Sequence, residues 1–221
     1  MIRQAAFLSL ALVTGFASAA PIPAQTFSSD VVKTIYTLPT ASSDSVFVGF
    51  DFSFTGKVQN NDFLGLWFGD STSTVAGQDG PNFGFKANCG DGKNKCTNDV
   101  FGRTFGTSGD FITGSDLKAD TTYKLFAHVY KTNESSVFNA MDVWLNPTQY
   151  EMWSLTGADI TTTGNAKFSK IDTIGFRAAN VDNGLTLSVN NLRVNEIPEP
   201  GSVALMGLAL AGLAAARRKR A

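Results

Sequence analysis

Residues 46–54 read VFVGFDFSF and give the clearest indication of the fold of this chain. Apolar side chains recur at every second position of the stretch, namely at Val46, Val48, Phe50, Phe52 and Phe54. Because successive side chains of a strand point to opposite faces of its sheet, this alternation predicts a strand with one buried face. The small or polar residues Gly49, Asp51 and Ser53 would then lie on the opposite face.

Similar runs follow along the chain and predict further strands at residues 63–68, 82–87, 100–105, 123–130, 141–146, 171–178 and 185–194. Residues 28–45 are interpreted as an edge strand followed by a loop. Clusters of Gly, Asn, Asp, Ser and Thr separate the runs, and these residues favour turns. No stretch between the two ends shows the 3.6-residue periodicity of an amphipathic helix. With 18 phenylalanines to fill a core, the prediction is an all-β, antiparallel β-sandwich.

The N-terminus has the three parts of a secretory signal peptide. A short basic start, MIRQ, precedes the apolar residues 5–16, and Ala17-Ser18-Ala19 forms a cleavage site of small residues. Cleavage is predicted after Ala19, and cleavage after Ala20 is nearly as good. Residues 1–19 are therefore assigned as a signal peptide and left out of the fold.

The C-terminus carries a second processing pattern. Pro198-Glu199-Pro200 precedes an uncharged run at residues 202–216, SVALMGLALAGLAAA, and then the basic cluster RRKR at residues 217–220. Because this run is apolar and uncharged, it predicts a transmembrane helix. The helix would be short, since it would reach about 22 Å and the hydrocarbon core of a bilayer is roughly 30 Å thick. The basic end favours the cytoplasmic side of the membrane.

This order of motif, short helix and basic end resembles the PEP-CTERM sorting signal of Gram-negative bacteria, here at residues 196–221. The resemblance implies export across the inner membrane, with the C-terminal helix in that membrane only transiently. It also implies an exosortase as partner, which recognises the Pro198-Glu199-Pro200 region and removes the helix. The expected final location is the cell surface or the medium.

Residues 20–195 remain as a single domain, long enough to bury one core. They contain 13 basic and 17 acidic residues, a net charge of −4. No cluster of basic residues is visible in the sequence, and nucleic-acid binding requires one, so no nucleic acid is expected as a partner.

The two cysteines, Cys89 and Cys96, lie close together in NCGDGKNKC. In an exported protein an even number of cysteines favours a disulfide. The alternative is a zinc site, but a second Cys/His pair is missing and His128 is the only histidine of the chain. We therefore predict a Cys89–Cys96 disulfide.

The strand order of the body, from TTYKLFAHVY through MDVWLNPT to the closing LTLSVNNLRV, resembles the concanavalin A-like jelly roll of lectins and glucanases. The likeness covers roughly residues 46–194 and implies the sandwich fold. Together with the sorting signal it implies a structural or carbohydrate-binding component of the extracellular polysaccharide matrix. Polysaccharide is thus a second expected partner.

Residues for catalysis are sparse. A glycosidase needs two carboxyl groups across the scissile bond, and the body has only two glutamates. Glu134 lies in the turn TNESS, and Glu151 has no partner glutamate on its predicted strand. His128 has no Gly-x-Ser-x-Gly serine to activate. A non-catalytic protein without a cofactor is therefore expected. The alternative is a glycan-degrading enzyme of the jelly-roll glucanase type, whose acidic pair comes from an aspartate and Glu151.

One face of two predicted strands favours ligand binding. If residues 123–130 pair with residues 141–146, five side chains meet on the face opposite the core: Phe126, His128, Tyr130, Asp142 and Trp144. Aromatic rings beside a carboxylate suit a sugar ring, which stacks on its apolar face and forms hydrogen bonds through its hydroxyls. The alternative is that a loop or the other sheet covers this face. Loop aspartates and asparagines do not match an EF-hand, so no metal site is predicted.

Overall fold

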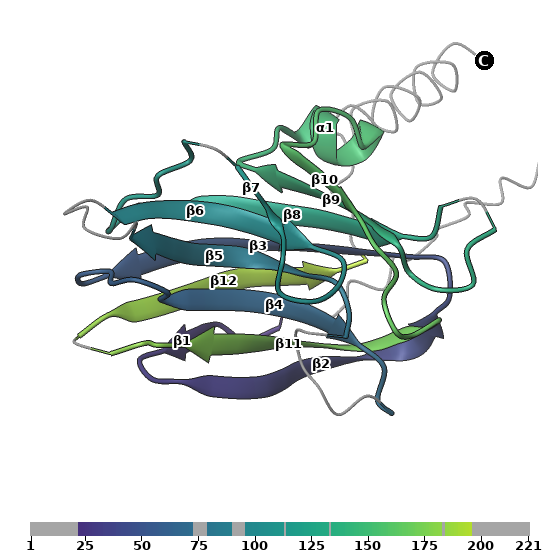
Figure 1. Cartoon of the computed structure of the whole chain (residues 1–221), viewed down its shortest axis with the longest axis horizontal. Helices are drawn as coiled ribbons and strands as arrows, with labels where there is room; N and C mark the ends of the chain where they lie inside the picture. Colours follow the sequence, from purple (N-terminus) through teal and green to yellow (C-terminus); the bar gives the residue numbers. More distant parts are fainter. Residues whose placement is uncertain are drawn as a thin grey trace, which may run out of the picture.

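The computed structural model describes residues 22–72, 79–89, 96–112, 114–132, 134–182 and 184–195. These residues form two six-stranded antiparallel sheets packed face to face, with one short helix at the edge of the molecule (Figure 1). The signal peptide and the C-terminal helix expected from the sequence lie outside the described residues. Within those residues, no helix combines the length and apolar character needed to cross a bilayer.

The first sheet has the strand order β1-β12-β3-β8-β9-β10. Its strands are β1 (Gln25–Phe27), β12 (Thr186–Val194), β3 (Ser45–Thr55), β8 (Tyr123–Tyr130), β9 (Ala140–Leu145) and β10 (Ile160–Thr163). The second sheet has the order β2-β11-β4-β5-β6-β7. Its strands are β2 (Val31–Ser42), β11 (Ile171–Ala179), β4 (Phe63–Gly69), β5 (Asn82–Cys89), β6 (Cys96–Arg103) and β7 (Asp110–Phe111).

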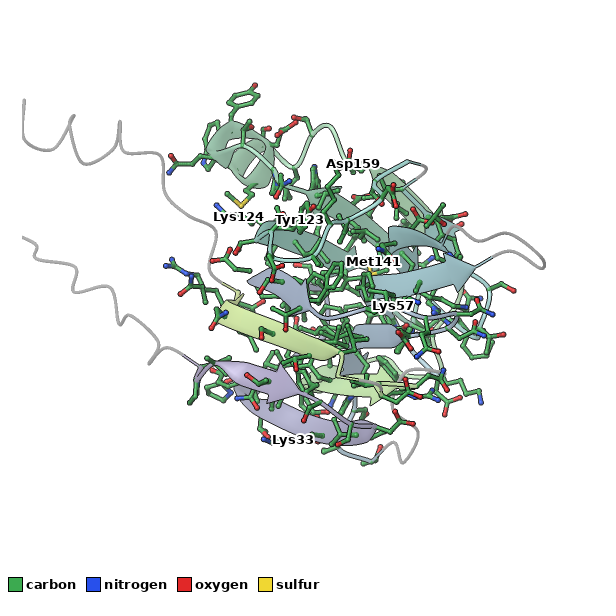
Figure 2. The ribbon with its side chains drawn as sticks, turned by 90° about the vertical axis from the view of Figure 1, so that its left-hand side faces the viewer. Lys33, Lys57, Tyr123, Lys124, Met141 and Asp159 are labelled. Carbon is green, nitrogen blue, oxygen red and sulfur yellow. The ribbon has the colours of Figure 1, made fainter. Side chains whose placement is uncertain are left out.

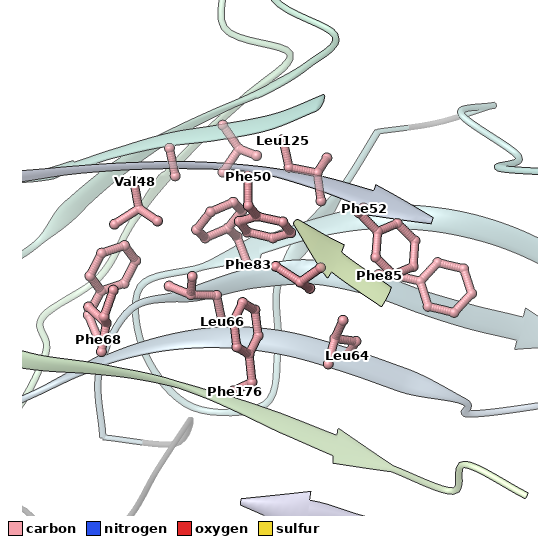
Figure 3. Close-up of a cluster of buried hydrophobic side chains, with 14 of the residues drawn as sticks. Val48, Phe50, Phe52, Leu64, Leu66, Phe68, Phe83, Phe85, Leu125 and Phe176 are labelled. Atoms are coloured by element: carbon pink, nitrogen blue, oxygen red, sulfur yellow. The ribbon is translucent and has the colours of Figure 1, made fainter. Parts of the chain in front are cut away.

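The alternating side chains of β3 form the centre of the core, as the sequence predicts. Val46, Val48, Phe50, Phe52 and Phe54 are all buried. Phenylalanines of β5 meet them from the second sheet: the ring centroids of Phe50 and Phe83 lie 5.5 Å apart, and those of Phe52 and Phe85 lie 5.2 Å apart (Figure 3). Interdigitating aromatic rings of this kind fill the space between the two sheets.

The predicted strands are confirmed with shifts of a few residues at their ends. The largest shift is in β6, which begins at Cys96, four residues earlier than expected. The edge strand expected near the N-terminus is β2, which pairs with β11 at one edge of the second sheet.

The short helix α1 (Gln149–Ser154) is not expected from the sequence pattern. Thr148 caps it: its Oγ1 accepts a hydrogen bond from Glu151 N, and the Glu151 carboxylate accepts one from Thr148 N at 2.7 Å. This reciprocal pair is a capping box, which satisfies two backbone N–H groups that the first helical turn leaves unpaired. Six residues are too few to show a helical periodicity, so the hydrophobic pattern gives no sign of α1.

Candidate functional site

The sequence correctly pairs β8 with β9 and places the five predicted ligand-binding residues on one outer face. In the ladder Phe126 lies opposite Trp144, and His128 lies opposite Asp142. The prediction that the indole of Trp144 is open to a ligand is wrong, however. Trp144 is 1% exposed and Phe126 is 2% exposed, and both pack against Met152 of α1. The Trp144 Nε1 donates a hydrogen bond of 2.9 Å to the backbone carbonyl of Thr156, beyond the helix. The covering segment left open as an alternative is therefore α1.

The remaining three residues of this face form a packed cluster rather than a stacking platform. The His128 ring lies between those of Phe47 and Tyr130, with centroid distances of 4.4 and 4.5 Å and nearly parallel planes. Both faces of the imidazole are thus occupied by protein. Asp142 accepts a hydrogen bond of 2.7 Å from Thr161 Oγ1 and faces the Tyr130 phenol.

The pKa shifts of His128 and Tyr130 also indicate that their side chains are packed in the protein. Burial lowers the pKa of His128 to about 4, although the nearby Asp142 carboxylate acts in the opposite direction. Burial and Asp142 together raise the pKa of Tyr130. His128 is therefore neutral near pH 7, and the prediction of a sugar platform built on Phe126, His128, Tyr130 and Trp144 does not agree with the geometry.

The residues considered for catalysis are committed to local structure. The Glu151 carboxylate is occupied by the capping box, and those hydrogen bonds to Thr148 lower its pKa. Glu134 lies in a turn with a positive φ of 59° and is exposed. Among the described residues, no three His, Cys, Asp or Glu side chains come together in a way that could hold a metal ion.

The backbone register bears on the cysteine prediction. Cys89 and Cys96 are directly opposite each other at the end of the β5–β6 ladder. Opposite residues of antiparallel strands have Cα atoms about 4.5–5.5 Å apart, within the range of disulfides. Their side chains lie outside the described part of the structure, so the disulfide stays a prediction.

The outer face of the second sheet has a groove that the sequence does not predict. It has a volume of about 310 Å³ and runs across β11, β4, β5 and β6. We call it the cationic groove because three of its lining residues are basic. The lining residues are Asn61, Phe63, Lys86, Arg103, Thr107, Arg177, Ala179 and Asn180.

Arg103 is the least accessible cation of the groove, with 9% of its surface exposed. Its guanidinium lies over the ring of Phe101, with Cζ 4.4 Å from the ring centroid, and 5.6 Å from that of Phe63. Its Nη1 donates a hydrogen bond of 3.1 Å to the backbone carbonyl of Thr107. Its Nε is buried and has no hydrogen-bond partner among the described residues.

No carboxylate neutralises this site in the described part of the chain. Among the described residues, no ion pair closer than 4 Å is seen for Lys86, Arg103 or Arg177. Burial lowers the pKa of Arg103 to about 10, and the charge of Arg177 acts in the same direction. A buried cation beside a second cation is costly unless an anion compensates for it.

A glycine makes room for this arrangement. A Cβ at Gly65 would lie 2.6 Å from Cζ of Phe63, and 3.3 Å from Cζ of Phe101. The missing side chain therefore allows the Phe63 ring to lie over Gly65, beside Arg103. The signal for the groove is weak in the sequence because Arg177 of β11 lies far along the chain from Lys86 of β5 and Arg103 of β6. The register that brings the three together is visible only in the folded sheet.

A second groove lies on the opposite face, between α1 and the outer surface of β12, β3 and β8. We call it the α1 groove; its volume is about 400 Å³. Its lining includes Gly49, Asp51, Lys124, Phe126, Gln149, Met152, Asn191 and Arg193. Among the described residues, Asp51 is the one carboxylate that lines either groove, so neither shows the carboxyl pair that glycoside hydrolysis needs.

A family model described as the PEP-CTERM protein-sorting motif matches residues 196–220. The chain carries a PEP-CTERM sorting signal. This signal indicates export across the membrane and processing by an exosortase, and hence a location at the cell surface or in the medium. The sequence prediction of this signal is confirmed. No curated protein matches the chain.

The body of this PEP-CTERM protein is a jelly-roll β-sandwich. The structure of alginate lyase Aly36B is similar to it with a TM-score of 0.50 and 11% identity, covering 80% of this chain and 81% of that chain. The Emp47p carbohydrate recognition domain has a TM-score of 0.41 and 11% identity, covering 80% and 90%. A single-residue variant of human galectin-16 has a TM-score of 0.39 and 15% identity, covering 72% and 94%. The predicted fold class is confirmed by the two packed antiparallel sheets and the first of these likenesses.

Proposed function

We propose that the exported body is a non-catalytic protein that binds acidic polysaccharide of the extracellular matrix in the cationic groove. The observation that carries the proposal is the guanidinium of Arg103, which is buried beside Arg177 without a carboxylate partner among the described residues. A polyanion chain would supply the missing charge. The polar groups around Arg103 also suit a sugar, since the amides of Asn61 and Asn180 line the same groove.

The chemistry of the groove fits a chain of uronate or sulfated sugars. A guanidinium donates parallel hydrogen bonds to a carboxylate or sulfate, and such charge-assisted bonds are about twice as strong as neutral ones. Lys86 and Arg177 provide two more positive charges along the groove. Phe63 is half-buried and offers apolar surface to a sugar ring. The export of the protein brings it to the place where such polymers occur.

Two observations favour binding over cleavage. The cationic groove is lined by no carboxylate, histidine or tyrosine among the described residues, so of the usual groups that transfer a proton Lys86 alone lines it there. Glu151, the glutamate of the alternative enzyme, caps α1 on the other sheet. A mutant of alginate lyase Aly36B has also been solved in complex with an alginate trisaccharide, in a structure that is similar to this one with a TM-score of 0.50. The fold is therefore compatible with either role, and the groups in the groove favour the binding role.

The proposal is tested by titrating residues 20–195 with alginate, a polyuronate, and with neutral dextran. Arg103→Met retains a chain that can lie on Phe101 but removes the charge, and Lys170→Met removes the same charge from an exposed site outside both grooves. We expect alginate to bind in preference to dextran. Arg103→Met should weaken alginate binding at least about tenfold, because a charge-assisted hydrogen bond contributes about 1.5–3 kcal/mol. Lys170→Met should not change it.

Two results would contradict the proposal. One is undiminished alginate binding by a folded Arg103→Met variant, with folding checked by its melting temperature. The other is the appearance of new reducing ends or of unsaturated sugar products during incubation with alginate, which would favour the enzyme instead.

A further inference from the structure

We propose that α1 is a membrane contact of the precursor, the chain that still carries its C-terminal sorting signal. Tyr150 and Trp153 of α1 would then lie in the headgroup region of the bilayer, so the partner is a lipid surface. Figure 2 shows α1 at one end of the sandwich, next to Lys124 of β8 and at the opposite end from Lys33 of β2. The contact is independent of polysaccharide binding, since the cationic groove lies on the other sheet.

Two aromatic side chains of α1 are open to solvent. Tyr150 is 67% exposed and Trp153 is 56% exposed, more than any other aromatic residue that the structure describes. They are three residues apart on the helix and therefore lie on the same side of it, with ring centroids 6.4 Å apart. Met152 is buried instead and packs against Phe126 and Trp144. The helix is thus held to the sheet by Met152, and the two exposed rings are left for another contact.

The end of the described chain lies beside α1. Asn195 N donates a hydrogen bond of 2.8 Å to the backbone carbonyl of Phe47, and Asn195 Oδ1 accepts one of 3.1 Å from Phe47 N. The Phe47 side chain in turn packs against the cluster of Phe126, Trp144 and Met152 beneath the helix. The chain therefore leaves the body at the end where the two rings are exposed.

The chain from this point to the membrane is short. Six residues, 196–201, separate Asn195 from the apolar run at residues 202–216, which the sequence predicts to enter the bilayer. Fully extended, the chain from residue 195 to residue 202 spans at most about 25 Å. A compact body of this length is about 40 Å across. Before the sorting signal is processed, the surface around Asn195 and α1 is therefore the part of the body that faces the membrane.

Tyrosine and tryptophan suit this location. Each combines an apolar ring with one polar group, and both are enriched where proteins meet the headgroup region of a bilayer. Two such rings bind lipid weakly by themselves, since even a single myristoyl chain gives only marginal membrane binding. Attachment to the membrane raises their effective concentration at the bilayer, so the weak contact forms in the precursor. Removal of the C-terminal segment then releases the body.

A sugar chain is the other class of ligand that binds exposed aromatic rings. The planes of Tyr150 and Trp153 are tilted by 53° to each other, so they do not form a flat platform on which successive sugar rings stack. The carboxylate of Glu151 already accepts hydrogen bonds from Thr148 in the capping box, which leaves it less free to bind sugar hydroxyls. The geometry therefore favours a lipid surface.

The test uses residues 20–221 reconstituted in vesicles of phosphatidylcholine with brominated acyl chains, because bromine quenches tryptophan fluorescence on contact. These vesicles have no net charge, so quenching does not depend on electrostatic attraction. Trp153 is the reporter, since the other two tryptophans, Trp67 and Trp144, are 8% and 1% exposed. We expect the wild type to be quenched relative to vesicles without bromine.

Two variants show whether the aromatic pair makes the contact. Tyr150→Ser removes one of the two rings and should reduce the quenching of Trp153 at least about twofold. Phe105→Ser removes an exposed ring just after β6, away from α1, and should be quenched as the wild type is. Melting temperatures establish that both variants are folded.

Four results would overturn the membrane contact. The first is no quenching of the wild type by brominated lipid, and the second is undiminished quenching in a folded Tyr150→Ser variant. The third is quenching that persists in Trp153→Phe, since it would then arise elsewhere in the chain. The fourth is fluorescence that responds to alginate or dextran but not to brominated lipid, which would assign the rings to a sugar ligand. The effect of Arg103→Met on alginate binding tests the cationic groove separately from all four.

Discussion

Among the individual side chains, Arg103 is the most unusual. Its guanidinium is stacked on Phe101 and bound to one carbonyl, yet it faces Arg177 rather than a carboxylate. An arginine is seldom buried unless it is paired, because removing its charge from water costs free energy. In the free protein this cost opposes folding, and a bound anion would offset it. A ligand that binds only the native state also raises the melting temperature, so alginate should stabilise the wild type more than Arg103→Met.

His128 gives a prediction of pH dependence. Its pKa is about 4 in the folded protein, against 6.5 for an exposed histidine. Between these values the unfolded chain binds more protons than the folded one, so stability falls as the pH falls from about 6.5 to about 4. His128→Phe keeps a ring between Phe47 and Tyr130 and removes the titrating group. We expect its melting temperature to fall less over this pH range than that of the wild type.

The comparison isolates His128, because Asp142 and Tyr130, the titratable groups that act on this cluster, are retained in both proteins. Parallel dependences of the melting temperature on pH for the two proteins, from about pH 4 to about pH 7, would contradict the prediction, because they would mean that the pKa of His128 is the same in the folded and the unfolded protein.

Among the secondary-structure elements, α1 acts as a cover for Trp144. Thr148→Ala removes the side chain that caps the helix and should cost about 0.5–2 kcal/mol of local stability. The indole N–H of Trp144, bound to Thr156 at the end of this segment, reports on the cover. Its hydrogen exchange, followed by NMR, should become faster in Thr148→Ala. Tyr150→Ala, at a helical position that is 67% exposed, should leave the exchange unchanged. Equal exchange rates in the two variants would show that the Thr148 cap does not stabilise the packing of α1 on Trp144.

The β5–β6 hairpin gives a prediction about the cysteines. The opposed positions of Cys89 and Cys96 are compatible with a disulfide, and peptide mapping without reductant should find them linked within one chain. Because the loop they close is short, replacing both with serine should cost roughly 2–3 kcal/mol or less, and the fold should remain. Two free thiols in protein exported to an oxidising compartment would refute the disulfide.

Elements differ in how well the sequence predicts them. The β3 pattern predicts the buried face correctly because a period of two follows directly from the geometry of a strand, as Phe50 and Phe52 show. The spacing Thr148-x-x-Glu151 is the sequence signal of the capping box, and it is easily overlooked because α1 has no measurable periodicity. The sequence correctly predicts that Trp144 points away from the core. It does not predict that Trp144 is buried, because the burial depends on α1, a separate segment that packs on the indole. The cationic groove depends on the register of separate strands.

For the molecule as a whole, the distribution of charge matters more than its sum. The body has a net charge of −4, yet the described part of the cationic groove contains three cations and no carboxylate. Such a groove attracts a polyanion locally although the protein as a whole repels it. Screening by salt should therefore weaken alginate binding while the fold is unaffected, since the core is held by apolar contacts between the two sheets.

Maturation determines where the cationic groove operates. The sorting signal at residues 196–220 implies removal of the C-terminal segment, and the signal peptide predicted from the sequence would be removed as residues 1–19. Mass spectrometry of the exported protein should therefore find a chain that begins at Ala20 or close to it and lacks residues 202–220. The loss of Arg217, Arg218, Lys219 and Arg220 would also leave the mature protein more acidic. An exported form that retains this basic cluster would instead indicate a protein anchored to the membrane, whose cationic groove could join a matrix only at the cell boundary.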